Sequence, residues 1–247
     1  MRLEKSEISL VGARESNQDR IACLIDPQGA FVVVCDGMGG HQAGEQAAEI
    51  AGRALCDRYG AVERPLMDPL GFLHLALGAA HAQVVQFGAD QPVEIRPRAT
   101  SAVLLVQDGA AYWAHVGDSR IYHIRDGAVL TRTRDHSHVE LLLREGLIGR
   151  EQMQGHPMRN FVESCLGGEA LLPEMTLSGR NALRSGDLLL VCTDGLWGTL
   201  TDEQIAKSLS APEQRLSDAL YLLARRAVEA GGSTADNTSA VVLRCLD

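Results

Sequence analysis

Residues 31–41 read FVVVCDGMGGH, a run of strand-forming apolar residues that ends in Asp36 and then Gly. A strand that ends in this way brings a negative charge to a sheet edge with little steric cover. The pattern recurs in YWAHVGDSR, LLLVCTDGLWG and TADNTSAVVL, which carry Asp118, Asp194 and Asp236. If the fold brings these four carboxylates together, they repel one another unless cations lie among them. We therefore expect a hard-metal site, used for hydrolysis by activated water.

Two other Asp-Gly pairs show what an ordinary turn of this composition looks like. Asp108-Gly109 and Asp126-Gly127 each lie between two apolar, strand-like runs and predict two-residue β-hairpin turns. Asp36-Gly37 and Asp194-Gly195 differ, because no matching return strand follows either of them. A turn alone therefore does not explain these two pairs.

Composition sets the class of protein. The 247 residues are 45% hydrophobic and contain no evident linker, so we expect a single domain spanning 1–247. The formal charge of −9 argues against nucleic-acid binding, which needs a basic face. Only Lys5 and Lys207 are lysines, so nearly all the cationic charge is Arg, the better fork for phosphate oxygens.

The same composition predicts location. We find no run of about 18 apolar residues and no signal-peptide core, so no membrane partner is expected. The six cysteines show no CxxC motif and no paired spacing, which indicates reduced thiols rather than disulfides or a zinc site. We therefore expect a cytoplasmic protein.

The order of predicted elements indicates the architecture. Three strands precede two helices, one over 44–59 and one from Pro69 to about Phe87 that Asp68 would cap. Hairpins follow, and the last third predicts strands, helices at about Asp202–Leu209 and Pro212–Ala230, and a closing strand. Two hairpin-rich regions, each with a helix pair, predict an α+β fold: a four-layer αββα sandwich of two antiparallel sheets flanked by helix pairs.

The segment from about Asp135 to Gly168, called the flap below, interrupts the strand pattern. It contains a short predicted helix in HSHVELLLREG and then a loop with His and Arg residues. An excursion of this kind between hairpins usually lies on the surface, so we expect the flap to cover a site.

Five segments together resemble a known family. RESNQD, DGMGGHQAGE, VGDSR, TDGLW and a late DN occur in the order found in the PP2C-type (PPM) metal-dependent Ser/Thr protein phosphatases. DGMGGH followed by a helix of small residues is similar to the bacterial branch, and the flap is similar to that branch's flap segment. The resemblance extends over essentially the whole chain, and five ordered motifs are far more specific than any one of them.

The resemblance implies a set of metal ligands. Asp36 would bridge two ions, and the backbone carbonyl of Gly37 would bind the first. Asp194 and Asp236 would hold the second ion, and Asp118 with Asp194 would hold a third. Mn²⁺ and Mg²⁺ both favour carboxylate, carbonyl and water oxygens, so these are the expected cofactors.

The resemblance also implies the reaction. Arg14 would bind the substrate phosphate, and Asp19 would anchor metal-bound water from behind the ligands. A metal-bridging hydroxide would attack the phosphate of a Ser/Thr phosphoprotein in line, with no phosphoenzyme. The catalytic set is then Arg14, Asp36, Asp194 and Asp236. The expected partners are Ser/Thr-phosphorylated proteins and a cognate Ser/Thr kinase whose action the enzyme opposes, and we expect a monomer.

Two positions depart from the family pattern. Met38 stands where eukaryotic relatives have a His proposed as the general acid, so another group must protonate the leaving oxygen. Gln18 stands where many relatives have Glu, which could alter metal affinity or water orientation. We interpret His41 as a loop-capping or packing residue, and the roles of His136 and His138 stay open.

Two other functions stay open at this stage. A pseudophosphatase would bind phosphoproteins without hydrolysing them, but the chain retains the four residues of the catalytic set. A hydrolase of small phosphate esters or nucleotides lacks any base-binding signature. The absence of GxxxxGK[ST], GxSxG and HExxH argues against nucleotide-cradling, serine-hydrolase and zincin chemistry. We expect Ser119 to be a hydrogen-bonding residue and not a nucleophile.

Overall fold

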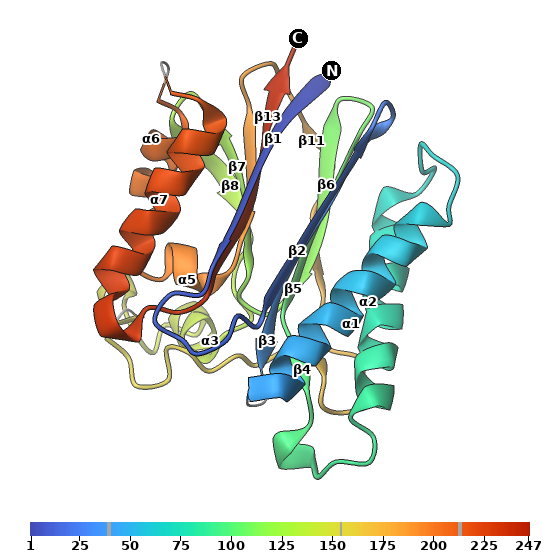
Figure 1. The fold of residues 1–247 in the computed structure, drawn as a ribbon, viewed down its shortest axis with the longest axis vertical. Helices are drawn as coiled ribbons and strands as arrows, with labels where there is room; N and C mark the ends of the chain where they lie inside the picture. Colours follow the sequence, from blue (N-terminus) through green and yellow to red (C-terminus); the bar gives the residue numbers. More distant parts are fainter. Residues whose placement is uncertain (39–40, 154, 212–213) are drawn as a thin grey trace.

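The computed structural model describes residues 1–38, 41–153, 155–211 and 214–247, and the side chains of His41 and Gln42 lie outside the description. Two antiparallel sheets pack face to face (Figure 1). The first has the strand order β1 (Arg2–Leu10), β13 (Thr238–Leu246), β12 (Leu188–Cys192), β7 (Arg120–Arg125) and β8 (Ala128–Arg132).

The second sheet is built around β3 (Gly29–Met38), which pairs with β2 (Asp19–Asp26) and β5 (Ser101–Gln107). β6 (Ala110–Val116) lies on the far side of β5. Four short strands extend this sheet: β4 (Arg98–Ala99) and β9 (Leu166–Gly167) beyond the end of β3, and β10 (Thr176–Leu177) and β11 (Asn181–Ala182) beside β6.

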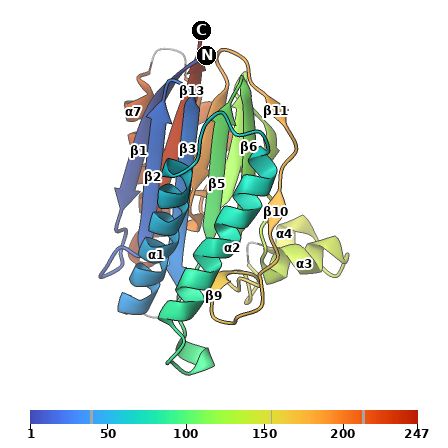
Figure 2. The same cartoon turned by 90° about the vertical axis from the view of Figure 1, so that its right-hand side faces the viewer.

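A helix pair covers the outer face of each sheet. α1 (His41–Gly60) and α2 (Pro69–Phe87) lie on the second sheet, and α6 (Asp202–Leu209) and α7 (Leu216–Gly231) lie on the first (Figures 1 and 2). The remaining helices are α3 (His138–Arg144), α4 (Arg150–Met153), α5 (Asp194–Trp197) and 3₁₀ turns at Val93–Ile95 and Gly232–Thr234. The predicted αββα sandwich is confirmed.

The apolar run before Asp36 forms the centre of this arrangement. Phe31 and Val33 face α1 and α2, while Val32 and Val34 face the other sheet, and all four side chains are buried. A strand that is covered on both faces reads as a continuous apolar run and not as an alternating one. The same layer structure therefore explains why this stretch lacks polar residues.

The turns and the helix cap that the sequence predicts are also confirmed. Asp108-Gly109 and Asp126-Gly127 form the two-residue turns of the β5–β6 and β7–β8 hairpins, and all four residues have positive φ. This is the backbone that a type I′ turn requires and that Asp-Gly favours. Asp68 caps α2, because its side chain accepts a hydrogen bond from the amide of Gly71 at 2.9 Å.

Three expectations need correction. The helix predicted from Pro212, which lies outside the described residues, begins at Leu216, because Arg215 is extended and the buried stripe of α7 starts with Leu216. The strand predicted to end at Asp36 continues to Met38, because Gly37 and Met38 pair with β4.

The third correction concerns α2. Among the described residues it is one helix that is long and apolar enough, by length and composition, to cross a membrane, and we did not expect such a stretch. Leu73, Leu77 and Val84 pack against the second sheet, as they would in a core helix. A single helix with these properties is weak evidence for a membrane span.

The flap lies beside the sandwich and carries α3 and α4, which project next to β10 (Figure 2). Its two ends are tied together by a β-bridge between Ser137 and Val162 and by the amide of His138, which donates to the carbonyl of Phe161. The assignment of one domain with a functional flap stays a prediction.

Replacing Asp68 tests whether this residue stabilises α2 as its N-terminal cap. We expect Asp68→Ala to lower the free energy of unfolding by about 1 kcal/mol, because the amide of Gly71 loses its acceptor. Urea unfolding followed by circular dichroism measures this, with Asp90→Ala at another exposed site as the control. Equal urea midpoints for the two variants would contradict the capping role.

Candidate active site

One cavity of about 520 Å³ collects the acidic residues that the sequence singled out. Its lining includes Arg14, Asp36, Gly37, Asp118, Asp194 and Asp236. These residues come from the loop after β1, the end of β3, the β6–β7 turn, the start of α5 and the segment before β13. Five distant segments therefore meet at one place, as predicted.

Backbone pairing positions Asp36. It lies opposite Asp19 in the register of β2 and β3, and its amide donates to the hydroxyl of Thr100 at 3.1 Å. The amide of Thr100 donates in return to the carbonyl of Asp36 at 2.8 Å. The Thr100 hydroxyl is also 2.7 Å from that of Ser119, the residue after Asp118. One threonine thus links two of the acidic segments, and Ser119 is the hydrogen-bonding residue that we expected.

Pairing of β12 with β13 positions Asp194. The amide of Thr193 donates to the carbonyl of Ser239, and the Ser239 amide donates to the Thr193 hydroxyl, each at 3.0 Å. That hydroxyl donates to Oδ2 of Asp19 at 2.9 Å. Gly195 permits a close approach, because a Cβ there would lie 2.0 Å from the carbonyl oxygen of Asn237. Asp194 is thereby held beside the segment that carries Asp236.

Asn237 clamps the loop that carries Arg14. Its Nδ2 donates to the carbonyls of Val11 and Ser16 at 2.8 and 2.9 Å, and its Oδ1 accepts from the amide of Gln18 at 2.8 Å. One buried amide side chain therefore fixes three points of the loop between β1 and β2.

Arg14 reaches the acidic cluster directly. Its Nη2 donates to Oδ2 of Asp236 at 2.6 Å, while 58% of the Arg14 side chain stays exposed. The residue predicted to bind phosphate is thus paired with one that was predicted to bind metal. A guanidinium at this place keeps further donors for an incoming oxyanion.

The carboxylates of this cavity destabilise one another. Burial, together with repulsion from Asp19 and then Asp194, raises the pKa of Asp36 well above its usual value. Burial and repulsion from Asp194 do the same to the pKa of Asp118. Burial and the neighbouring Asp236 raise the pKa of Asp194 to about 6. Nearby arginines offset this only in part, so the charged forms of these side chains stay disfavoured.

Asp19 lies behind the cavity and is 3% exposed. Burial raises its pKa to about 7, against the hydrogen bonds from Ser239 and Thr193. Its Oδ1 has no hydrogen-bond partner in the described part of the chain. A buried oxygen without a partner is costly, which indicates that a group outside the protein chain completes this site.

Most of the chain matches a known protein family. A family model described as protein phosphatase 2C matches residues 10–227. The chain belongs to the protein phosphatase 2C family.

Individual relatives agree with this assignment. The chain is 32% identical over 217 residues to the serine/threonine protein phosphatase PstP of Mycobacterium tuberculosis, covering 88% of this chain but only 40% of PstP. It is 32% identical over 235 residues to the protein phosphatase PhpP of Streptococcus pneumoniae, covering 93% of each. A crystal structure of the catalytic domain of PstP in complex with two manganese ions is similar, at 29% identity and a TM-score of 0.82, covering 99% of both chains.

The cavity suits hard cations that take only some of their ligands from the protein. Within the described ranges, no group of three or more His, Cys, Asp or Glu side chains forms a metal cage by itself. Mg²⁺ and Mn²⁺ accept backbone carbonyls and keep several waters, so one or two carboxylates per ion suffice. Repelling carboxylates and the unpartnered oxygen of Asp19 fit this kind of site.

The departures from the PP2C pattern lie at the same cavity. Met38 and Gln18 both line it. His136 instead accepts from the amide of Gly117 and faces Thr176. His138 pairs with Glu163 at 2.7 Å, so neither His136 nor His138 lines the cavity, and the side chain of His41 lies outside the description.

Sequence reasoning missed several supporting residues. Thr193 precedes Asp194 and Asn237 follows Asp236, so adjacency to a predicted ligand could have identified them. Thr100 has no such signal, because it enters the site only through strand pairing. Asn160 and Val162 of the flap also line the cavity, which the sequence could predict only as a general cover.

Removing one repelling charge tests the electrostatics. We expect Asp36→Asn to raise the free energy of unfolding of the chelator-treated protein, because burial and the charges of Asp19 and Asp194 disfavour a carboxylate at this position. Mn²⁺ should then raise the thermal midpoint of the variant less than that of the parent. Asp126→Asn, in an exposed hairpin turn, is the control. A less stable variant with an undiminished Mn²⁺ response would contradict the account.

Proposed function

We propose that the chain is a Mn²⁺- or Mg²⁺-dependent phosphatase of Ser/Thr phosphoproteins. One observation carries the proposal: four carboxylates and one arginine from five distant segments line a single cavity. Membership of the PP2C family and the similarity to PstP and PhpP support it.

The residues that would hold the ions are those of the cavity. Asp36 and the carbonyl of Gly37 would bind one ion, and Asp36, Asp194 and Asp236 would bind a second. The PstP domain crystallised with two manganese ions supports this number. We propose a third ion at Asp118, whose carboxylate is buried beside Asp194. The ions would lower the pKa of water and shield the charge of the phosphate.

Arg14 would orient the substrate. A cation held by Asp236 would weaken its 2.6 Å pair with Arg14, and the guanidinium would then be available to two phosphate oxygens. The clamp formed by Asn237 holds the Arg14 loop while this exchange takes place. A planar fork held in position suits the terminal oxygens of a phosphate monoester.

Attack on phosphorus would come directly from water. The hydroxyl of Ser119 is engaged with Thr100, and no cysteine is among the described residues of the cavity. The oxygen of water would form a bond to phosphorus as the bond to the Ser or Thr oxygen breaks, and the released oxygen takes a proton. Asp19, with one oxygen held by Thr193 and one without a partner, would accept a hydrogen bond from water.

The wider role is also a proposal. We place the enzyme in a bacterial cytoplasm as a monomer that opposes a cognate Ser/Thr kinase. The similarity to PstP and PhpP supports a role in bacterial signalling. All six cysteines are free, which suits a reducing compartment.

Metal-dependent turnover tests the proposal. We expect hydrolysis of p-nitrophenyl phosphate and of a Ser/Thr phosphopeptide with Mn²⁺, and none with EDTA. Asp194→Ala should lower kcat/KM by about 100-fold or more, because ligand loss exceeds the 10- to 100-fold cost of losing an outer partner. Asp126→Ala is the matched control. A folded protein that binds phosphopeptides but hydrolyses nothing under any metal condition would be a pseudophosphatase.

The role of Arg14 has its own test. Arg14→Ala should raise KM for a phosphopeptide about 10-fold or more, because a charge-assisted hydrogen bond to phosphate is lost. Arg53→Ala, on the exposed face of α1, is the control. Steady-state kinetics with an unchanged KM would remove the phosphate role of Arg14.

A further inference from the structure

A second cavity, of about 210 Å³, lies behind the flap and is called the arginine cavity below. Adjacent flap residues line the two cavities: Asn160 faces the candidate active site and Arg159 the arginine cavity. Trp197, which also lines the arginine cavity, donates its indole N–H to the carbonyl of Asp118 at 3.0 Å. The linings of the two cavities are thus joined by adjacent flap residues and by this hydrogen bond.

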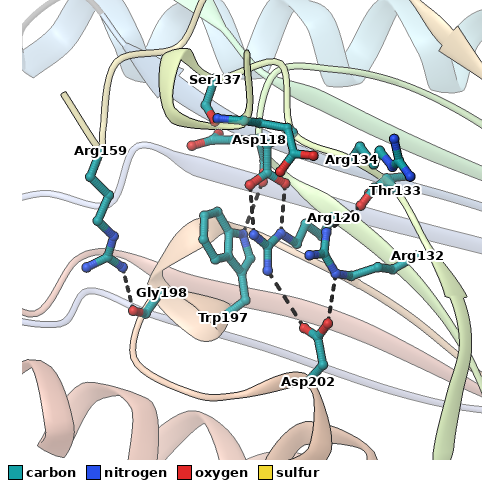
Figure 3. A network of polar contacts seen from close by, with 12 residues as sticks. Asp118, Arg120, Arg132, Thr133, Arg134, Ser137, Arg159, Trp197, Gly198 and Asp202 are labelled. Carbon is teal, nitrogen blue, oxygen red and sulfur yellow. Dashed lines mark hydrogen bonds and ion pairs between the residues drawn. The ribbon is translucent and has the colours of Figure 1, made fainter. Parts of the chain in front are cut away.

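Four arginines line this cavity, and two of them are neutralised within the protein. Arg120 donates from Nε and Nη2 to both oxygens of Asp135, at 2.8 and 2.7 Å, and stacks on Trp197 with 3.4 Å between guanidinium carbon and ring centroid. Arg132 donates from Nε to Asp202 at 2.8 Å (Figure 3). These pairs are structural, and they account for both nearby carboxylates.

The other two arginines form no ion pair with a carboxylate in the described part of the chain, although the charge of Arg159 acts on Asp194 and offsets part of the rise in the pKa of that carboxyl. Arg159 reaches down to the carbonyl of Gly198 at the end of α5, as Figure 3 shows, and makes no ion pair. Arg150, at the start of α4, makes no hydrogen bond or ion pair among those residues. Of the four guanidinium groups in this cavity, two therefore form no ion pair among the described residues, on a chain of net charge −9.

Two hydroxyl groups add directed donors. The side chains of Ser137 and Thr201 line the cavity and cap helices, accepting from the amides of Glu140 at 3.4 Å and Gln204 at 3.2 Å. A hydroxyl that accepts a hydrogen bond still has its own hydrogen to donate. The cavity thus combines unpaired guanidinium charge with neutral donors, the combination that binds tetrahedral oxyanions.

We propose that the arginine cavity binds a phosphate group, held mainly by Arg150 and Arg159. If arginines only anchored the flap, each would have a partner on the core, and Arg150 has none among the described residues. Two sources share this chemistry: free orthophosphate, or a second phosphate on the same substrate. The second source rests on the proposed function, whereas anion binding itself does not.

Occupancy of this site would bear on the active site. A bound phosphate connects α4 through Arg150 to the flap turn that carries Arg159, beside the Thr201 cap of α6. The position of Arg159 sets that of Asn160 in the catalytic cavity. Binding behind the flap therefore stabilises one placement of the residues in front of it.

Equilibrium dialysis with radiolabelled orthophosphate tests the site on the full chain. In EDTA, which weakens the catalytic cavity as a phosphate site, we expect one saturable phosphate per chain. Arg150→Gln should weaken it about 10-fold or more, because a charge-assisted contact is lost. Arg144→Gln, an equal charge change on the exposed face of α3, should leave it unchanged, and so should Arg14→Gln in the catalytic cavity.

Absence of saturable binding in EDTA would overturn the proposal, as would binding that Arg14→Gln abolishes and Arg150→Gln leaves intact. Neither result depends on catalysis, so failure here is distinct from failure of the proposed function.

Peptide kinetics then identify the source of the bound phosphate. A KM advantage of a doubly over a singly phosphorylated peptide that Arg150→Gln removes assigns the site to the substrate's second phosphate. Equal KM values, with phosphate binding retained, assign it to orthophosphate.

Discussion

Repulsion among buried carboxylates is the constraint on which the rest of this structure depends. Asp36, Asp118 and Asp194 all have raised pKa values, because burial and neighbouring negative charge act in the same direction. Such a cluster tends to open unless rigid elements hold it. The two sheets supply that rigidity through paired backbone, and supporting residues such as Thr193 tie one carboxylate to the next segment.

The structure compensates for this negative charge only in part. Arg14 pairs with Asp236, the more exposed end of the cluster, and arginines offset the charge of the deeper carboxylates only in part. Among the arginines behind the flap, two guanidinium groups form no ion pair with a described carboxylate. Carboxylates thus dominate the cavity that Asn160 lines, and guanidinium groups dominate the cavity that Arg159 lines. Each cavity suits a ligand of the opposite charge.

Much of this arrangement could be predicted from the sequence because it depends on local patterns. A run buried on both faces predicted β3, Asp-Gly pairs predicted the hairpin turns, and Asp68 predicted a helix cap. Contacts between distant segments could not be predicted in this way. Thr100 joins Asp36 only because β4 and β5 follow β3 in register, and the pairing of Arg14 with Asp236 depends on a loop that Asn237 folds back. The arginine cavity escaped notice for the same reason, since its arginines are spread through the flap and its neighbours.

The central claim is that divalent cations bind between Asp36, Asp194 and Asp236. Anomalous diffraction from crystals soaked in Mn²⁺ measures this most directly, because it locates the ions without reference to activity. The account predicts two strong anomalous peaks in the 520 Å³ cavity, each within coordination distance of these carboxylates. Crystals with full Mn²⁺ occupancy elsewhere and no peak among these side chains would contradict it.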